Sequence, residues 1–112
     1  MTQSTDRTKR RFRRRTVRVL VEYLSDSGLR CETATTLGPG GLFIETDSPL
    51  AIGALLKLCF RLSEAGIHHE IEGRIVWSKP DADGTVGTPG MGVEFLDRAA
   101  TRVLGHELEA LD

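Results

Sequence analysis

The sequence predicts an all-β domain that ends in one helix and is built as an antiparallel barrel or sandwich. Apolar and polar residues alternate in about six short segments between residues 17 and 95, with glycine, proline, aspartate and serine clustered between the segments. After residue 97 the leucines recur at helical spacing instead. Because strands and helices do not alternate along the chain, a parallel sheet is excluded. The length of 112 residues fits one domain.

The N-terminal half predicts three strands joined by two tight turns. In the first strand, valines and Tyr23 occupy one face while Arg18 and Glu22 occupy the other, which is typical of a half-buried strand rich in β-branched residues. The segments 26–28 (Asp-Ser-Gly) and 38–41 (Gly-Pro-Gly-Gly) carry the residues that favour chain reversal. The expected strands cover residues 17–23, 29–37 and 42–45.

The C-terminal half predicts three more strands and the helix. The expected strands cover residues 55–62, 67–78 and 91–95. In the second of these, Ile71, Ile75 and Trp77 fall on one face and are expected to point inward. The helix, over about residues 98–111, has Asp97 as a suitable N-cap and is expected to cover one opening of the barrel. Its apolar stripe consists of Leu104, Leu108 and Leu111.

The net charge of −1 conceals a strong separation of charge along the chain. Residues 1–18 carry eight basic side chains and one acidic side chain, a net +7, whereas residues 19–112 carry seven basic and fifteen acidic side chains, a net −8. Residues 1–9 are polar without apolar periodicity, so we expect a disordered tail before a single domain over residues 10–112. That domain begins with an arginine-rich arm, residues 10–15. A basic arm on an acidic body indicates an anionic partner, or an arm that folds back on its own domain.

The turn over residues 38–41 is the second feature that points to function. Glycine permits positive φ and lets a ligand approach the main chain closely. We expect the arm and this turn to meet in space, with the functional site where they meet. The alternative interpretation of the turn is a plain hairpin without a ligand.

Catalytic and metal-binding functions find little support in the sequence. His68 and His69 are adjacent in a predicted strand, so they point to opposite faces and cannot chelate one metal together. His106 has no cysteine or second histidine at ligand spacing, and no nucleophile elbow or P-loop occurs. Cys31 and Cys59 are expected to be buried free thiols, because they lie in apolar, strand-like surroundings and because a reducing compartment disfavours the alternative, a disulfide between them. The sequence has no C-x-x-C pair, which disfavours a structural zinc site. The sequence therefore predicts a protein that is not an enzyme and holds no metal.

The sequence also predicts a cytoplasmic protein. No segment approaches the roughly 18 apolar residues that span a membrane. The basic N-terminus does not continue into a signal peptide, because the run that follows it is interrupted by Arg18 and Glu22.

Three interpretations of the arginine-rich arm are open. It could be a solvated tail, a nonspecific nucleic-acid arm, or a clamp for a small phosphorylated ligand that carries guanine. The acidic body and the aromatic content of 5% both disfavour nucleic acid. Arginine suits the third role, since its planar fork bonds phosphate oxygens bidentately, pairs with guanine O6 and N7, and stacks on bases.

The order of motifs resembles the PilZ domain family over residues 10 to about 111. Residues 10–14 (Arg-Arg-Phe-Arg-Arg), followed by Val17 and a strand that ends at Glu22 and Tyr23, resemble its R-x-x-x-R signature. Residues 36–41 align with its (Asp/Asn)-x-Ser-x-x-Gly turn, which an apolar strand follows. Later segments that are similar to the family are Pro49-Leu50, Ile52-Gly53, residues 73–77 and residues 90–95. In particular, the chain is similar to small stand-alone PilZ-type proteins of bacteria.

The resemblance implies a six-stranded antiparallel β-barrel with a C-terminal helix and binding of the second messenger cyclic di-GMP. Arg10 and Arg14 match the two signature arginines, which contact phosphate and guanine, and Arg11 and Arg13 are auxiliary candidates. Gly41 matches the final glycine of the turn motif.

Two positions of the turn depart from the family pattern. Thr36 replaces the aspartate or asparagine, and Gly38 replaces the serine. A carboxylate can accept two hydrogen bonds from the guanine N1 and N2 edge, whereas threonine offers one hydroxyl and glycine offers no side chain. Each missing hydrogen bond costs about 1–3 kcal/mol.

Two hypotheses for the function follow. In the first, the chain is a cyclic di-GMP receptor whose arm closes over the ligand against residues 36–41 and passes this ordering to a partner protein. In the second, it is a degenerate PilZ domain that does not bind the messenger and acts as an interaction module in motility, surface behaviour or polarity. An exposed face with residues such as Val76 and Leu20 could also support a homodimer.

Overall fold

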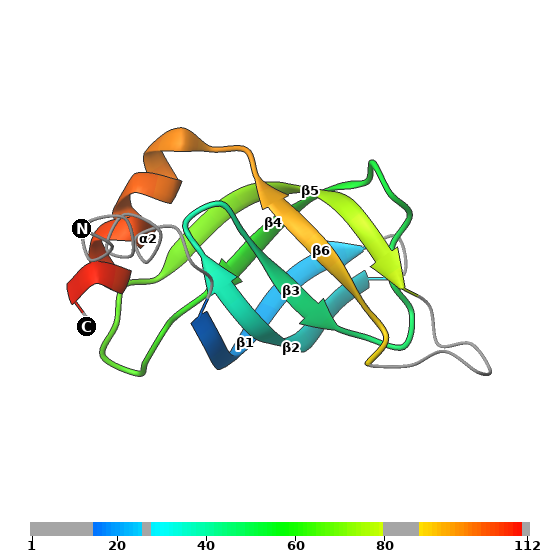
Figure 1. Ribbon diagram of the computed structural model, residues 1–112, viewed down its shortest axis with the longest axis horizontal. Helices are drawn as coiled ribbons and strands as arrows, with labels where there is room; N and C mark the ends of the chain where they lie inside the picture. Colours follow the sequence, from blue (N-terminus) through cyan, green and yellow to red (C-terminus); the bar gives the residue numbers. More distant parts are fainter. Residues whose placement is uncertain (1–14, 26–27, 80–87, 111–112) are drawn as a thin grey trace, which may run out of the picture.

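The computed structural model describes residues 15–25, 28–79 and 88–110, within which six strands close into an antiparallel barrel and one helix follows (Figure 1). The elements are β1 (Arg15–Ser25), β2 (Gly28–Gly38), β3 (Gly41–Glu45), β4 (Leu55–Phe60), β5 (His69–Lys79), β6 (Gly90–Phe95) and α2 (Arg98–Ala110). Around the barrel the order is β1-β2-β3-β6-β5-β4. The predicted fold class is confirmed, and a barrel rather than a sandwich is formed. The predicted tail, residues 1–9, and arm residues 10–14 lie outside the described residues.

The barrel interior is filled by the apolar side chains that alternate along each strand. Val21, Leu58 and Ile71 are all fully buried and come from three successive strands of the barrel. Burying a side chain of this size stabilises the fold by about 1.5–3 kcal/mol relative to leaving it exposed. The rest of the core comes from further positions on all six strands and from two leucines of α2.

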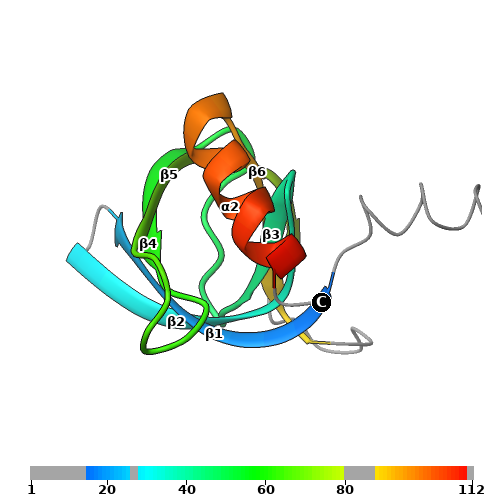
Figure 2. The ribbon, with the colours of Figure 1, turned by 90° about the vertical axis from the view of Figure 1, so that its left-hand side faces the viewer.

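Helix α2 lies across one end of the barrel (Figure 2). Leu104 and Leu108 are its buried residues, as predicted, whereas Leu111 lies outside the described residues. The backbone N–H of Ala100 donates to Asp97 Oδ1 at 3.1 Å, which confirms Asp97 as the N-cap.

One carboxylate attaches α2 to the barrel. An oxygen of Glu107 lies 2.5 Å from Nε2 of the buried His69, at the start of β5. The other oxygen accepts a hydrogen bond from the backbone N–H of Ile67 at 3.1 Å. These contacts hold the helix against the turn that joins β4 to β5.

A polar network fills the opposite end of the barrel. Tyr23 is buried and its hydroxyl donates to Glu32. Arg30 donates to Glu32 at 2.9 Å and to the Thr46 hydroxyl at 2.7 Å, and its guanidinium lies 5.3 Å from the centre of the Tyr23 ring. Burial, followed by the hydrogen bond and charge of Glu32, raises the pKa of Tyr23 well above its ordinary value. The phenol therefore stays protonated and keeps its role as donor.

Two predictions of side-chain direction are wrong. Trp77 is 47% exposed rather than inward, because the register of β5 against β6 shifts between Ile75 and Trp77. A bulge adds one residue, Val76, and moves the following side chain to the other face. Cys31 is exposed rather than buried, because the inward positions of β2 near it are those of Arg30 and Glu32.

The apolar residues suggested for a dimer face do not form one patch. Val21, next to Leu20, aligns across β4 with Phe60 and then with His69 at the start of β5. Val76 lies seven residues further along β5, about 20 Å or more away. Both side chains are exposed, but they belong to different parts of the surface.

The turn between β2 and β3 is a tight hairpin in which Gly38 pairs with Gly41. The described glycines with positive φ are Gly28 and Gly53, so this turn does not use the left-handed freedom that we expected of it. Gly41 is needed for a different reason, since a Cβ there would lie 2.1 Å from the backbone oxygen of Val93 in β6. A Cβ at Gly40 would meet nothing within 4 Å.

We predict that Gly41→Ala destabilises the barrel by about 1–3 kcal/mol, because a backbone carbonyl cannot move aside as a flexible side chain can. Gly40→Ala is the matched control, in open space one residue away, and is expected to change the free energy of unfolding by less than about 0.5 kcal/mol. Urea unfolding of both variants measures the difference, and equal losses of stability would show that the close approach to β6 is not the constraint.

We also predict that Glu107→Ala lowers the free energy of unfolding by about 1.5–3 kcal/mol, because it removes the interactions of a charged group with both His69 and the Ile67 N–H. Glu109→Ala removes an exposed carboxylate from the same helix and serves as the control. Thermal unfolding monitored by circular dichroism compares them, and an unchanged Glu107→Ala midpoint contradicts the prediction.

Candidate functional site

The structure describes one half of the predicted site. Thr36, Gly38 and Gly41 lie at the end of β2 and the start of β3. Arg10, Arg11, Arg13 and Arg14 lie outside the described residues. The end of the arm is placed, because Arg15 opens β1 and pairs with Leu37, and Thr16 pairs with Thr36. The chain thus enters the barrel beside the end of β2, just before the glycine-rich turn.

Thr36 belongs to a row of outward positions that runs across four strands. Leu37 is fully buried, so its neighbour Thr36 faces outward and is partly exposed. In register, Thr36 pairs with Phe43 of β3, Phe43 with Gly92 of β6, and Gly92 with Trp77 of β5. The row places two aromatic rings next to the threonine on the outer surface of the barrel.

Phe43 and Trp77 form a tilted aromatic pair over β6. Their ring centres are 5.5 Å apart, with 52° between the planes. Gly92 lies between them in register, and a Cβ at Gly90 would lie 2.4 Å from Cζ of Phe43. Gly90 therefore leaves the space that the Phe43 ring occupies over the sheet. With Trp77 about half exposed, the pair presents an aromatic surface to solvent.

Irregular pairing surrounds this row. The register shifts between Thr16 and Val19 in β1, and between Ala34 and Thr36 in β2. The shift before Trp77 in β5 is the third irregularity. Bulges re-aim side chains and are common next to binding sites. Here they lie on both sides of the surface formed by Thr36, Phe43 and Trp77.

A charged pair borders the same surface at the next register position. Gly41 pairs with Glu94 of β6, and Glu94 pairs with Arg74 of β5. The guanidinium of Arg74 donates to Glu94 at 3.0 Å, and both side chains are about half exposed. These groups form a polar edge beside the aromatic pair.

The arrangement is suited to a planar base that carries phosphate. The aromatic pair offers a stacking surface, Thr36 offers a hydroxyl, and the chain that leads to Arg15 brings a cluster of arginines. Sequence reasoning did not identify Phe43 or Trp77 as site residues. The available signal was the single tryptophan of the chain, but strict alternation assigned it to the core.

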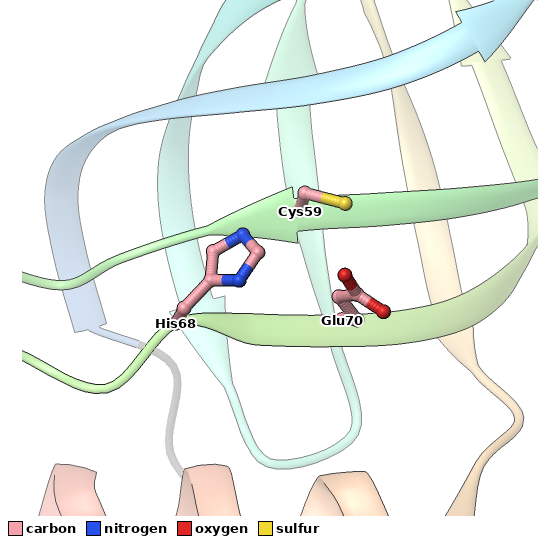
Figure 3. A group of neighbouring side chains, drawn as sticks. All are labelled: Cys59, His68 and Glu70. Atoms are coloured by element: carbon pink, nitrogen blue, oxygen red, sulfur yellow. The ribbon is translucent and has the colours of Figure 1, made fainter.

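A second group of functional side chains lies elsewhere on the outer surface. Cys59 of β4, Glu70 of β5 and His68, just before β5, each offer one ligand atom, and these atoms all lie within 4.8 Å of one another (Figure 3). Burial, followed by the charges of Glu70 and Glu22, raises the pKa of the Cys59 thiol, while Lys57 opposes the rise. The prediction that His68 and His69 point to opposite faces is confirmed, since His69 is buried and His68 is exposed.

None of the helices among the described residues is long and apolar enough to cross a membrane. A search among curated proteins gives no match.

Solved structures share the fold at low sequence identity. The chain is similar to the Bacillus subtilis inhibitor of motility MotI/DgrA, with a TM-score of 0.67, 17% identity, and coverage of 86% of this chain and 47% of that one. It is similar to Escherichia coli YcgR in complex with c-di-GMP, with a TM-score of 0.69, 15% identity, and coverage of 92% and 46%. The chain thus spans about half the length of both proteins.

The PilZ domain alone gives a match over nearly its whole length. The PilZ domain of Escherichia coli YcgR with c-di-GMP has a TM-score of 0.68, 16% identity, and coverage of 92% of this chain and 91% of that one. A model of the PilZ domain family matches residues 8–110 of the sequence. That match includes the arm, all six strands and the helix, and the chain therefore belongs to the PilZ domain family.

Proposed function

We propose that the chain is a non-enzymatic receptor for cyclic di-GMP, which binds on the outer surface formed by Thr36, Phe43 and Trp77. The observation that carries the proposal is the register, which brings the end of the arginine-rich arm and this surface side by side: Thr16 pairs with Thr36, and Thr36 with Phe43. Structural relatives solved with c-di-GMP support the choice of ligand.

The arginines supply the attraction for the two phosphates. Residues 1–18 carry a net +7 and the rest of the chain a net −8, so the arm is the part of the molecule that attracts anions. Arg10 and Arg14, with Arg11 and Arg13 beside them, can form bidentate bonds to phosphate oxygens and to guanine O6 and N7. Arg14 is joined directly to Arg15, which pairs with Leu37, so its tether to the site is a single residue.

The aromatic pair supplies a stacking surface for a guanine. Phe43 and Trp77 are neighbours across Gly92, where no side chain separates them. Stacking of a base on an aromatic side chain contributes about 1–3 kcal/mol. That gain is of the same size as one hydrogen bond that Thr36 or Gly38 cannot make. The outer surface can therefore offset part of the affinity that the turn does not supply.

The output of the receptor is an ordering of the arm. The free arm carries many like charges, and bound phosphates neutralise them as the arm closes over the ligand. The surface changed by closure then binds or releases a partner protein. The inhibitor of motility among the structural relatives supports motility as the process concerned.

The second candidate is a PilZ domain that has lost the messenger and acts as an interaction module. Thr36 and Gly38 favour it, since the threonine hydroxyl cannot replace a carboxylate toward guanine and glycine cannot replace the serine hydroxyl. Exposed leucines on β1 and β2 also favour it: Leu24 and Leu29, 67% and 70% exposed, are paired at the end of the first hairpin.

Calorimetric titration with cyclic di-GMP separates the two candidates. The receptor is expected to bind at micromolar protein concentration, Arg14→Ala to abolish the heat, and Trp77→Ala to weaken binding about tenfold because the stacking surface is removed. Arg61→Ala removes an exposed arginine just after the end of β4, a strand that does not contribute to the proposed surface, and is expected to leave the affinity unchanged. Absence of heat with the unmodified chain, and no arm ordering by NMR, would exclude the receptor.

Restoring the family residues tests the departure in the turn. The double variant Thr36→Asp, Gly38→Ser is expected to tighten binding about 10–100-fold, because two hydrogen-bonding groups for guanine are restored. Quenching of the single tryptophan, Trp77, reports the affinity directly. Because Gly38 is buried, Thr36→Asp alone is measured as well, with circular dichroism as the check on folding. Unchanged affinity in both variants would show that the turn does not limit binding.

A further inference from the structure

A row of polar side chains crosses the outer face of β1, β4 and β5. Glu22 of β1 pairs with Cys59 of β4, and Cys59 pairs with Glu70 of β5. Their neighbours Val21, Leu58 and Ile71 are fully buried, so these three side chains point outward. Adjacent strands lie about 4.7–4.9 Å apart, which sets the spacing along the row.

His68 completes the group at the start of β5. His69 is buried, with its ring 5.4 Å from that of Phe60 and its Nε2 against Glu107, which fixes the direction of the chain at this point. His68 is therefore outward, two residues before Glu70 and on the same face. Figure 3 shows the imidazole, the thiol and the carboxylate gathered over the ends of β4 and β5.

The three ligand atoms are close to the spacing that a metal ion requires. They lie within 4.8 Å of one another. A tetrahedral zinc ion, with Zn–S near 2.3 Å and Zn–N or Zn–O near 2.0–2.2 Å, holds its ligand atoms about 3.4–3.6 Å apart. A contraction of about 1 Å is within the reach of side-chain rotation, with no movement of the strands, because the His68 and Glu70 side chains are exposed.

We propose that Cys59, His68 and Glu70 form a binding site for a divalent transition metal ion, with zinc as the ion that fits this set of ligands. Thiolate, imidazole and carboxylate are all zinc ligands, and three of them leave one coordination position for water. Binding converts the Cys59 S–H to a thiolate, so one proton leaves to solvent as the metal–sulfur bond forms.

The surrounding charge favours a cation. Besides the ligand Glu70, the carboxylate of Glu22 lies on the other side of Cys59 in the same row. Lys57 is the nearby positive charge that would disfavour a cation. It pairs with Glu72 of β5, so a carboxylate also lies next to it. A metal ion at Cys59 would reduce the repulsion between the two acidic side chains that flank the thiol.

The site would tie the turn before β5 to the sheet. His68 ends that turn, and the neighbouring Ile67 N–H donates to Glu107 of α2 at 3.1 Å. A metal bridge from His68 to Cys59 would hold the turn at the point where it contacts the helix. Metal binding would therefore stabilise the attachment of α2, as any ligand that binds only the folded state does.

This site is separate from the proposed cyclic di-GMP surface. It uses β4 and the start of β5, whereas Thr36, Phe43 and Trp77 lie on β2, β3 and the far part of β5. Loss of metal binding and loss of nucleotide binding can therefore be told apart in the same set of proteins.

The test is titration of the full chain with Zn²⁺ in competition with a chromophoric chelator, and with Co²⁺ followed by absorption. One equivalent of metal is expected to bind, with the charge-transfer band of a Co²⁺–thiolate bond. Cys59→Ser should abolish that band, and His68→Ala and Glu70→Gln should each weaken binding about 100-fold, since even indirect partners of a metal contribute about 10–100-fold. Zn²⁺ should raise the unfolding temperature of the unmodified chain but not of Cys59→Ser.

Two control variants locate the ion. Cys31→Ser removes the other thiol, which lies on β2 and pairs with Glu22 from the side of β1 away from Cys59. His106→Ala removes an exposed histidine of α2. Both should bind metal as the unmodified chain does. No binding at micromolar Zn²⁺, a thiolate band that survives Cys59→Ser, or equally weakened binding in the controls would each overturn the proposal.

Discussion

The close approach of β3 to β6 is the constraint on which the rest of the barrel depends. It is possible only because Gly41 has no side chain, since a Cβ would overlap the carbonyl oxygen of Val93. This approach joins the N-terminal sheet of β1, β2 and β3 to the C-terminal strands. Once the barrel is closed, each outward residue acquires a fixed neighbour on the next strand. Both candidate surfaces are such rows, so their composition follows from the closure.

The presence of glycine at position 41 has two possible explanations. The family motif gives it a role beside the ligand, whereas the geometry gives it a role in strand packing. The packing role holds whether or not a ligand binds, so the presence of this glycine is not evidence for binding. Thr36 and Gly38 are the positions at which the chain departs from the motif. The nucleotide affinity that we propose therefore depends on the surface beside them.

The sequence predicted the elements well because their signals are local. Alternation located each strand to within a few residues, and Asp97 marked the start of the helix. The sequence could not locate the bulges. A bulge residue such as Val76 is apolar like its neighbours and gives no local signal, and its position depends on how β5 pairs with β6. That single residue moved Trp77 from the predicted core to the surface. The aromatic half of the candidate site was missed for this reason.

The sequence did not predict the second candidate site either, because that site depends on pairing between strands that are separate in the sequence. The sequence analysis excluded a shared metal for His68 and His69 because adjacent strand residues point to opposite faces, and the structure confirms these opposite directions. That exclusion does not extend to the whole chain, since the neighbours of a strand residue are set by register and not by spacing in the sequence. Cys59 is nine residues from His68 along the chain, yet its sulfur lies among the ligand atoms of His68 and Glu70. Each row of outward side chains across neighbouring strands is therefore a separate candidate binding surface. The two rows on this chain also differ in chemistry, one aromatic and next to a cationic arm, the other acidic with a thiol, which is why they suit ligands of opposite charge.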